Sequence, residues 1–410
     1  MTAHKNALLD YYQALDRLLH ELPSRQETET RTLTDAAGLV LADDIFVLRD
    51  VPPFDNSAMD GYALGGNLEN RKSWTIVQRI AAGDSLSETA LQTGEAARIF
   101  TGAPVPQGTS TILLQEEACI APDGITLSAT LPVQADQHIR RQGEEYRAGD
   151  CLIRAHERLT PAHIALLASQ GYETVRVFKP LTICIFSTGN ELVPPGVDLK
   201  SGQIYDANRF LLLSWLKDSI FTVHDGDILP DSESTVEAAL SEACKHADVI
   251  LTSGGVSVGE EDYLKQALIR LGKLNFWKLA IKPGKPFTWG EIGHCTVFML
   301  PGNPVSSLVT FQQLVVPALR VLMGEKPEAA QPQTFAARAA FSRKQKQKRR
   351  EFIRVVLNMD EGVLYALPMP QQGSAMLSSC TGAQALAEIP PLTAIEDNDL
   401  IRIYPLTYKV

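Results

Sequence analysis

The stretch that decides the fold lies between residues 181 and 307, where three apolar runs each end in a glycine turn. They are LTICIFSTG (181–189), DVILTSGG (248–255) and CTVFMLPGNPVSS (295–307). Runs of this length bounded by turn signals are typical of buried strands. FTVHDGDI (221–228) and NFWKLAI (275–281) predict two further strands. Helical patterns lie between and after these strands, at Ala207–Lys217, Ser232–His246, Asp262–Leu271 and Pro304–Met323. This alternation predicts a parallel sheet with helices on both faces.

The flanking segments have other patterns. Residues 6–22 carry an apolar stripe at helical spacing, and Thr32–Asp44 and Thr160–Ser169 predict two more helices. Residues 50–146 and 333–410 are rich in turn residues and short alternating runs, which indicates β structure, the second segment as a small barrel or sandwich. The one charge run, RKQKQKRR (343–350), is interpreted as a solvated hairpin tip rather than a binding patch.

Composition bounds the class of protein. A chain of 410 residues exceeds one compact core, and its net charge of −10 is unlike that of a nucleic-acid binder. The six cysteines are scattered, which indicates reduced thiols rather than a zinc site or disulfides. We find no signal peptide and no stretch of about 18 uncharged apolar residues, so we expect a cytoplasmic protein outside the membrane.

Three turns are expected at the carboxyl edge of the sheet, where ligands bind in open α/β folds. They contain Asn190 and Glu191, then Gly254, Gly255 and Ser257, then Pro301, Gly302 and Asn303. Glycine permits close backbone approach, and free N–H groups at a helix start attract anions. Each turn alone could be merely structural, but three at one edge favour a phosphate-bearing ligand.

Lysines and carboxylates accompany these turns. Lys278, Lys282 and Lys285 flank a Pro-Gly turn, where they could neutralise a polyanion or simply be solvated. Asp231 could cap the following helix, and Asp262 could interact favourably with the positive end of a helix dipole. Alternatively, Glu191, Asp231 and Asp262 could hold a divalent cation against ligand phosphates.

The β segment carries polar loops of its own. Asp60 lies in PPFDNSAMDGYA (52–63), and Thr101 in RIFTGAPVP (98–106). Arg140, Arg141 and Glu145 lie in IRRQGEE (139–145). These loops could bind oxyanions or metals, but residue chemistry alone assigns them no reaction.

Together with FSTGNEL (186–192), GQIYDANR (202–209), TSGGVSVGEEDY (252–263), KLAIKPGKP (278–286) and LPGNPVSS (300–307), these motifs resemble the molybdopterin molybdenumtransferase family. That family comprises the bacterial MoeA proteins and the E domain of gephyrin. The resemblance covers essentially the whole chain, and eight ordered motifs are far more specific than any single one.

The resemblance implies a multidomain α/β architecture with four domains. These are a discontinuous, mainly helical N-terminal domain (1–49 and 147–179), an inserted β domain (50–146), a molybdopterin-binding α/β domain with a parallel sheet (180–328) and a C-terminal β-barrel (329–410). It also implies a Mg²⁺-dependent reaction in which adenylated molybdopterin and molybdate give molybdenum cofactor and AMP. The chain is then a homodimer with a cross-subunit active site, and the adenylyltransferase and molybdoenzyme acceptors are possible contacts.

The resemblance also assigns the site. It implies catalytic roles for Asp60, Thr101, Glu191, Asp231, Asp262, Lys278 and Lys282, and substrate contacts for Arg140, Gly254, Gly255, Ser257, Pro301, Gly302, Asn303 and Ser374. The implied metal ligands are Asp262, Asp231, Glu191 and Glu145. In two departures from the family pattern, Glu145 stands where Asp is common and Ala207 where Ser or Thr is usual.

Three rival functions remain open at this point. The α/β domain alone would suit a molybdopterin adenylyltransferase, although that activity needs none of the other domains. A non-enzymatic dimeric scaffold would need no cluster of acids and lysines. A paralogue that inserts tungstate has no distinguishing sequence feature, because the two oxyanions share charge and shape.

Overall fold

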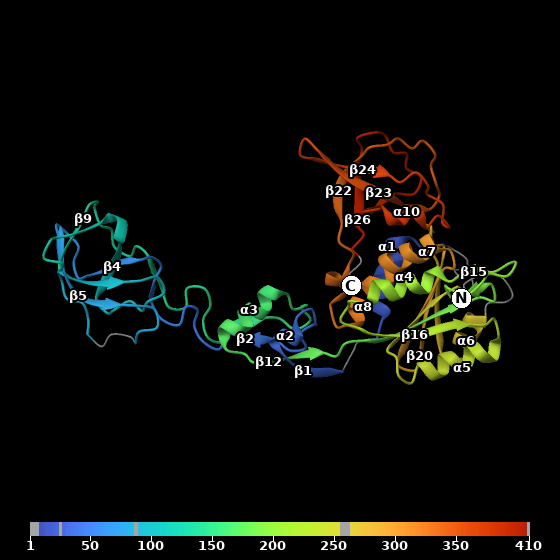
Figure 1. The fold of residues 1–410 in the computed structure, drawn as a ribbon, viewed down its shortest axis with the longest axis horizontal. Helices are drawn as coiled ribbons and strands as arrows, with labels where there is room; N and C mark the ends of the chain where they lie inside the picture. Colours follow the sequence, from blue (N-terminus) through green and yellow to red (C-terminus); the bar gives the residue numbers. More distant parts are fainter. Residues whose placement is uncertain (1–7, 24–26, 86–88, 255–262, 408–410) are drawn as a thin grey trace. The chain divides into compact units, whose positions relative to one another are not determined.

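The computed structural model describes residues 8–23, 27–85, 89–254 and 263–407. The chain divides into two compact units (Figure 1). The first unit comprises Met1–Ala42, His156–Pro161 and Thr174–Val410, and the second comprises Asp43–Ala155 and Ala162–Glu173.

The centre of the first unit is a six-stranded sheet. Its strands, in spatial order, are β16 (Thr222–Leu229), β13 (Thr182–Thr188), β17 (Val249–Ser253), β21 (Cys295–Leu300), β20 (Pro286–Ile292) and β18 (Lys273–Lys278). The first four run parallel, as predicted. The ends of β13, β17 and β21 therefore meet at one edge of the sheet.

Helices cover both faces of this sheet (Figure 1). On one face lie α4 (Ala207–Leu216) and α7 (Pro304–Thr310), and on the other lie α5 (Glu233–Ala243) and α6 (Tyr263–Leu271). Leu240 and Leu268 of the second pair pack with Val297 of β21 in a buried apolar core. Two short parallel strands, β14 (Leu192–Val193) and β15 (Ile204–Tyr205), extend the loop before α4.

The far side of the sheet differs from the prediction, because β18 and β20 are antiparallel to their neighbours. The sequence reading missed β20 altogether. Ile292 pairs with Cys295, so a two-residue turn, Gly293-His294, joins β20 to β21. Gly293 has φ +59°, the backbone conformation that tight hairpin turns need. The sheet is therefore mixed, and its parallel half carries the edge at which the glycine turns were predicted.

The last helix of this domain is continuous over the predicted span. It consists of α7, a π-helical turn η2 (Phe311–Val315) and α8 (Val316–Leu322). Pro304–Leu322 is also long and apolar enough to cross a membrane by composition, which the sequence reading overlooked. However, 78% of it is buried within the protein, as is typical of a core helix.

The C-terminal strands close into a barrel. They are β22 (Phe335–Ala339), β23 (Arg350–Asp360), β24 (Val363–Pro368), β25 (Ala385–Ile389) and β26 (Leu400–Pro405). Pairing runs β23–β24–β22–β26–β25 and returns to β23, so the sheet has no free edge. Two four-residue helices accompany these strands: α9 (Pro327–Ala330) precedes β22, and α10 (Ser378–Thr381) lies between β24 and β25. A short strand, β19 (Ile281–Lys282), pairs in parallel with the start of β23.

The interpretation of residues 343–350 as a solvated hairpin tip was wrong. The strands on either side, β22 and β23, do not pair with each other. Instead, Arg343 exchanges backbone hydrogen bonds with Ile395 at 2.6 and 3.0 Å, and Leu392 N–H donates to the Gln347 carbonyl at 2.7 Å. The basic run is thus hydrogen-bonded to the segment Leu392–Ile395 of the barrel domain, and Arg350 is buried.

The N-terminal part of the first unit begins with α1 (Tyr11–Glu21), where an amphipathic helix was predicted. The second predicted helix, Thr32–Asp44, was mostly wrong, since only α2 (Leu33–Ala36) is helical. The residues after it form bridges instead, Val40 with Arg158 and Leu41 with Val177. Beside them β1 (Thr28–Thr32) pairs antiparallel with β12 (Thr174–Phe178).

The second unit is built on a six-stranded sheet with an apolar cluster on each face. In spatial order its strands are β7 (Thr109–Leu114), β4 (Gly61–Gly65), β6 (Glu95–Ile99), β5 (Ser73–Ile80), β9 (Thr126–Ala129) and β8 (Ala118–Ile120), with the 3-10 turn η1 (Gln115–Glu117) before β8. Two small pairs complete it, β3 (Asn56–Ser57) with β10 (Ile139–Arg140) and β2 (Ile45–Phe46) with β11 (Cys151–Ile153), next to α3 (Pro161–Gln170).

These features confirm the predicted fold class: a multidomain chain with an α/β domain, β structure inserted in the N-terminal region and a C-terminal barrel. The four sets of domain boundaries stay a prediction.

Candidate functional site

The three glycine turns meet at the carboxyl edge of the parallel strands. Ser253, the last residue of β17, pairs with Ser187 on one side and Leu300 on the other. Gly254 follows with φ +93°, and a Cβ there would lie 2.5 Å from the Thr188 carbonyl oxygen. Only glycine fits this close approach of two backbones. The predicted residues Gly255, Ser257 and Asp262 lie outside the described residues.

A buried amide that sequence reasoning missed joins two of the turns. Asn208, in the first turn of α4, donates from Nδ2 to Ser253 Oγ and to the Gly302 carbonyl, both at 2.7 Å. Asp206, two residues before Asn208, caps α4 and accepts a hydrogen bond from Ser187 Oγ at 3.0 Å. The signal was present in YDANR, where a cap residue precedes an amide, but its partners are distant in sequence.

The carboxylates of this edge are arranged differently from the capping interpretation. Ser232, not Asp231, is the residue before α5, so Asp231 as a helix cap was wrong. Asp231 Oδ2 accepts the Asn190 N–H at 3.0 Å, and Asn190 Oδ1 accepts the Asp231 N–H at 3.1 Å. This reciprocal pair joins two loops that are distant in sequence, the one that carries Asp231 and the one that carries the exposed Glu191.

We tested whether these acids suit a divalent cation. Among the described residues, no group of three His, Cys, Asp or Glu side chains is placed to hold a metal. Glu191 and Asp231 offer the oxygen ligands that Mg²⁺ prefers, and Mg²⁺ commonly takes only one or two carboxylates together with substrate phosphates. The donor chemistry fits a metal that arrives with its ligand better than a cage of protein side chains.

The segment Lys278–Lys285, called the lysine segment below, lies between two other segments of the same chain, the residues before α1 and strand β23. The Lys278 carbonyl accepts the Leu9 N–H at 2.8 Å, and Lys282 lies in β19 against β23. Lys282 Nζ forms an ion pair with Glu351 Oε1 at 2.8 Å. Both lysines are half-buried, whereas Lys285 is exposed.

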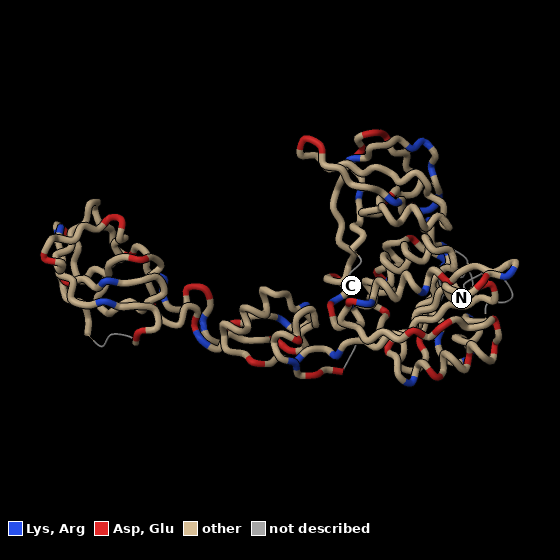
Figure 2. The backbone as a smooth tube through the Cα atoms, in the orientation of Figure 1, with Lys and Arg blue, Asp and Glu red and all other residues tan. Residues whose placement is uncertain are grey.

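Basic residues are scattered over both units (Figure 2), but several of them line one pocket of the first unit. This pocket, of about 470 Å³, lies between the lysine segment, the start of α7 and the barrel. It is lined by the predicted residues Lys282, Asn303 and Ser374 and by Arg343, Arg349 and Arg354, which were not predicted. Five lysines and arginines face one carboxylate, that of Glu351. The charge balance favours an anion.

The pocket arginines are held in place by the barrel. Arg354 is fully buried and donates to Ser379 Oγ at 3.1 Å and to the carbonyls of Gln371 and Gly373 at 3.0 and 3.2 Å. Burial lowers the pKa of Arg354 from its usual range. Ser374 is fixed through its carbonyl, which accepts the N–H of Val305 in α7 at 3.0 Å.

The second unit holds the other predicted residues. Asp60 Oδ1 accepts both the N–H and the hydroxyl of Thr101 at 2.8 Å. These two hydrogen bonds, the backbone one foremost, hold the pKa of Asp60 below its usual value. Arg140 and Glu145 are exposed on β10 and in the loop after it.

Next to Arg140, Arg141 forms ion pairs with Asp55 (2.6 Å) and Asp136. The predicted residues thus fall into two groups: Asp60, Thr101, Arg140 and Glu145 in the second unit, and the remainder in the first.

Fold and site together define a class: a multidomain α/β protein with a glycine-lined sheet edge and a basic pocket between the α/β domain and a barrel. Comparison with known proteins identifies the family. The MoeA N-terminal region (domain I and II) matches residues 9–171, a probable molybdopterin binding domain matches 184–321, and the MoeA C-terminal region (domain IV) matches 336–406.

Relatives match over nearly the whole chain. The molybdopterin molybdenumtransferase of Haemophilus influenzae is 40% identical over 374 residues, covering 91% of this chain and 92% of that protein. Molybdopterin molybdenumtransferase 2 of Mycobacterium tuberculosis is 35% identical, covering 92% and 95%. The crystal structure of the molybdopterin biosynthesis MoeA protein from Pyrococcus horikoshii OT3 is similar with a TM-score of 0.81 and 27% identity, covering 97% of this chain and all of that one. The chain belongs to the MoeA family of molybdopterin molybdenumtransferases, and is a transferase of molybdenum cofactor biosynthesis.

Proposed function

We propose that the chain inserts molybdate into adenylated molybdopterin, in a Mg²⁺-dependent reaction that yields molybdenum cofactor and AMP. The observation that carries this proposal is the basic pocket. It combines Lys282, Arg349 and Arg354 with the Ser374 region in a volume of about 470 Å³, next to the turn at Pro301–Asn303. A compact dianion needs several fixed cations and hydroxyl donors at close range, and the pocket supplies both.

The two ends of the site take different parts of the substrates. The turns at Gly254 and Gly302, with Asn208 beneath them, bind the phosphates of the adenylated ligand through backbone N–H groups. Glu191, Asp231 and Asp262 would hold Mg²⁺ together with those phosphates. The metal would supply positive charge to offset the charge that develops on the phosphate oxygens. Lys278 and Lys282 neutralise phosphate or the incoming molybdate.

Asp60 and Thr101 orient the dithiolene end of the ligand, with Arg140 and Glu145 beside them. Because these residues belong to the second unit, we propose that they contact the ligand bound by the α/β domain of the partner chain in a homodimer. Each active site is then built from residues of both subunits. The chain works in the cytoplasm, where the adenylyltransferase that supplies the ligand and the enzymes that accept the cofactor are possible contacts. Reduced thiols suit that compartment.

The test is release of AMP from adenylated molybdopterin and Mg²⁺, measured with and without molybdate. Lys282→Met should raise the KM for molybdate at least about tenfold, since one charge-assisted contact with an oxyanion contributes roughly 1.5–3 kcal/mol. Lys245→Met is the matched control, because Lys245 forms an exposed ion pair with Glu242 at the end of α5. Equal kinetics in the two variants would contradict the pocket assignment.

A parallel reaction with molybdopterin and ATP, and the same AMP-release assay with tungstate in place of molybdate, separate the rival functions. Consumption of ATP with formation of the adenylated ligand would identify an adenylyltransferase. Tight binding of the ligand without any AMP release would indicate a scaffold. Release that depends on tungstate but not on molybdate would identify the other oxyanion as the substrate.

A further inference from the structure

Two backbone segments flank the lysine segment and fix its position through hydrogen bonds. On one side, Leu9 accepts the Ala280 N–H at 2.9 Å and donates to Lys278. On the other, Arg350 N–H donates to the Ala280 carbonyl at 2.8 Å, which continues the β19–β23 pairing. The residues between Lys278 and Lys282 are thus held between the N-terminal segment and strand β23 of the barrel.

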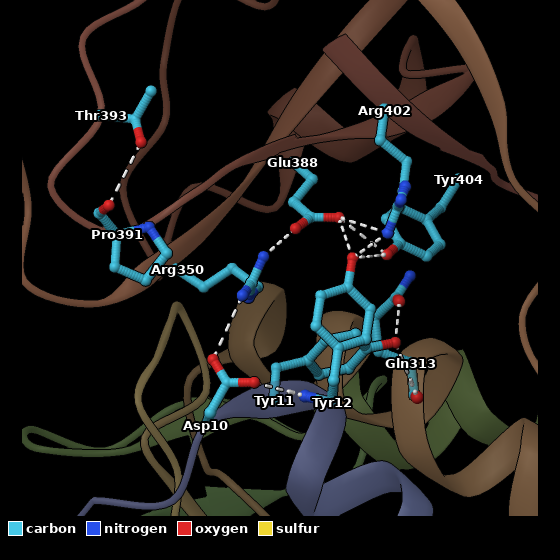
Figure 3. A network of polar contacts seen from close by, with 10 residues as sticks. All are labelled: Asp10, Tyr11, Tyr12, Gln313, Arg350, Glu388, Pro391, Thr393, Arg402 and Tyr404. Carbon is cyan, nitrogen blue, oxygen red and sulfur yellow. Dashed lines mark hydrogen bonds and ion pairs between the residues drawn. The ribbon is translucent and has the colours of Figure 1, made fainter.

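A partly buried polar cluster joins these two flanking segments (Figure 3). We call it the Glu388 cluster; its members are Asp10, Tyr12, Arg350, Glu388, Arg402 and Tyr404. Glu388 lies on β25, is only 4% exposed, and accepts hydrogen bonds from the hydroxyls of Tyr12 at 2.7 Å and Tyr404 at 2.9 Å. Its other oxygen pairs with Arg350.

Arg350 connects the cluster to the N-terminal segment. Its second guanidinium nitrogen donates to Asp10 Oδ2 at 3.1 Å, and its guanidinium lies 4.5 Å from the centre of the Tyr12 ring. Asp10 also caps α1 by accepting the Tyr12 N–H at 2.9 Å. One arginine therefore sets the distance between the start of α1 and the start of β23.

Strand geometry carries this constraint to the pocket. Successive side chains of a strand point to opposite sides. Arg350 points into the Glu388 cluster, and the next residue, Glu351, points to the basic pocket. There Glu351 pairs with Lys282 at 2.8 Å and with Arg343 at 2.7 Å. A shift of β23 by a fraction of an ångström would move Glu351, and both cations with it.

A polar cluster suits this task better than an apolar contact would. Apolar packing of equal volume is often as stable as a buried ion pair, so stability alone does not explain two arginines and a glutamate here. Hydrogen bonds and ion pairs are directional, however, so a network of them favours one arrangement of its members. In this cluster Arg350 uses both terminal guanidinium nitrogens, and only its buried Nε has no hydrogen-bond partner among the cluster residues.

We propose that Glu388 and Arg350 are positioning residues for the oxyanion: they fix β23 so that Lys282 and Arg343 present their charges at the correct spacing. This inference rests on the proposed function, because it concerns the pocket assigned to molybdate. It assigns a role in substrate affinity to a cluster that touches no substrate.

The test compares Glu388→Gln with the matched control Glu325→Gln. Glu325 is another buried glutamate of the first unit, 5% exposed and paired with Arg320 at 2.5 Å, but it does not border the lysine segment. The readouts are the dissociation constant of molybdate by calorimetry, the KM values for both substrates, and the unfolding temperature.

Glu388→Gln should weaken molybdate binding and raise its KM about tenfold, a modest displacement effect, with the KM of adenylated molybdopterin unchanged. Glu325→Gln should lower only the unfolding temperature. If Glu388→Gln does not fold, Tyr12→Phe replaces it, because this variant keeps the ring over Arg350 and removes one hydrogen bond to Glu388; a smaller loss of molybdate affinity is then expected.

Molybdate affinity that is unchanged, or that falls equally in the control, would overturn the positioning role. A native chain that binds no molybdate would overturn it too. A native chain that binds molybdate but releases no AMP would refute the proposed function instead, and the ratio of affinities between the two variants would still decide the positioning role.

Discussion

Replacement of Asn208 tests how the glycine-turn edge of the sheet is held together. In Asn208→Ala, the buried Ser253 hydroxyl and the carbonyl of the exposed Gly302 each lose a donor at 2.7 Å. A lost hydrogen bond that leaves a buried group without a partner costs about 1–3 kcal/mol, whereas water can replace the donor to an exposed carbonyl, so the substitution should cost roughly 1–3 kcal/mol. For an α/β domain of this size, this corresponds to a fall of roughly 3–10 °C in unfolding temperature.

Asn208→Asp separates support of the loops from electrostatics. The aspartate has the same shape, but it adds a negative charge to a largely buried position and sets a carboxylate oxygen against the Gly302 carbonyl oxygen. Its unfolding temperature should therefore be no higher than that of the alanine variant.

Binding of the phosphate-bearing ligand should separate the two variants further, with the weaker affinity in Asn208→Asp. A new negative charge about 6 Å from a phosphate costs roughly 3 kcal/mol at an effective dielectric constant of 20, or about a hundredfold in affinity. Thermal unfolding and calorimetric titration with adenylated molybdopterin measure the two effects separately. Equal affinity of the Asp and Ala variants would refute phosphate binding at this edge.

Three further predictions address other parts of the site. Gly254→Ala should abolish ligand binding and destabilise the domain by at least about 1–2 kcal/mol from backbone strain alone, measured by unfolding, because its Cβ would meet the Thr188 carbonyl at 2.5 Å; native-like binding would contradict it. Thr101→Val removes one of the two hydrogen bonds that lower the pKa of Asp60, so the acid limb of the pH–activity profile should move to higher pH, whereas an unmoved limb would exclude Asp60 as the group that limits activity there. Burial raises the pKa of Tyr404 above its unfolded value of about 10, so the neutral phenol contributes its full stability to the fold below that pH, and this contribution is lost as the pH rises further. Tyr404→Phe should therefore reduce the loss of unfolding free energy at alkaline pH by up to about 1.4 kcal/mol per pH unit. An unchanged slope of unfolding free energy against pH would be the contrary result.

The sequence was sufficient for features that depend on local pattern. Apolar runs that end in glycine turns predicted β13, β17 and β21, and the parallel arrangement of these strands follows from the helices between them. The same pattern predicted Gly254 and Gly302 at one edge. It did not predict β20, because an apolar run interrupted by Trp289-Gly290-Glu291 looks like a loop until its partner strands are known.

The basic pocket shows what the sequence could not provide. Lys282 was predicted from its Pro-Gly turn, but Arg349 and Arg354 reach the same pocket only because β19 pairs with β23, about seventy residues away in the chain. The run at 343–350 looked like a solvated tip because charge patterning does not reveal long-range pairing. The partners of Asn208 were hidden for the same reason.

The central claim is that release of AMP and insertion of molybdenum are one coupled reaction on this chain. The most direct measurement is a single-turnover reaction with adenylated molybdopterin and Mg²⁺, in which AMP and dithiolene-bound molybdenum are both counted as molybdate is varied. We predict equal amounts of the two products at every molybdate concentration, and neither product without molybdate. AMP released without molybdate, or molybdenum inserted while the adenylated ligand stays intact, would contradict the account.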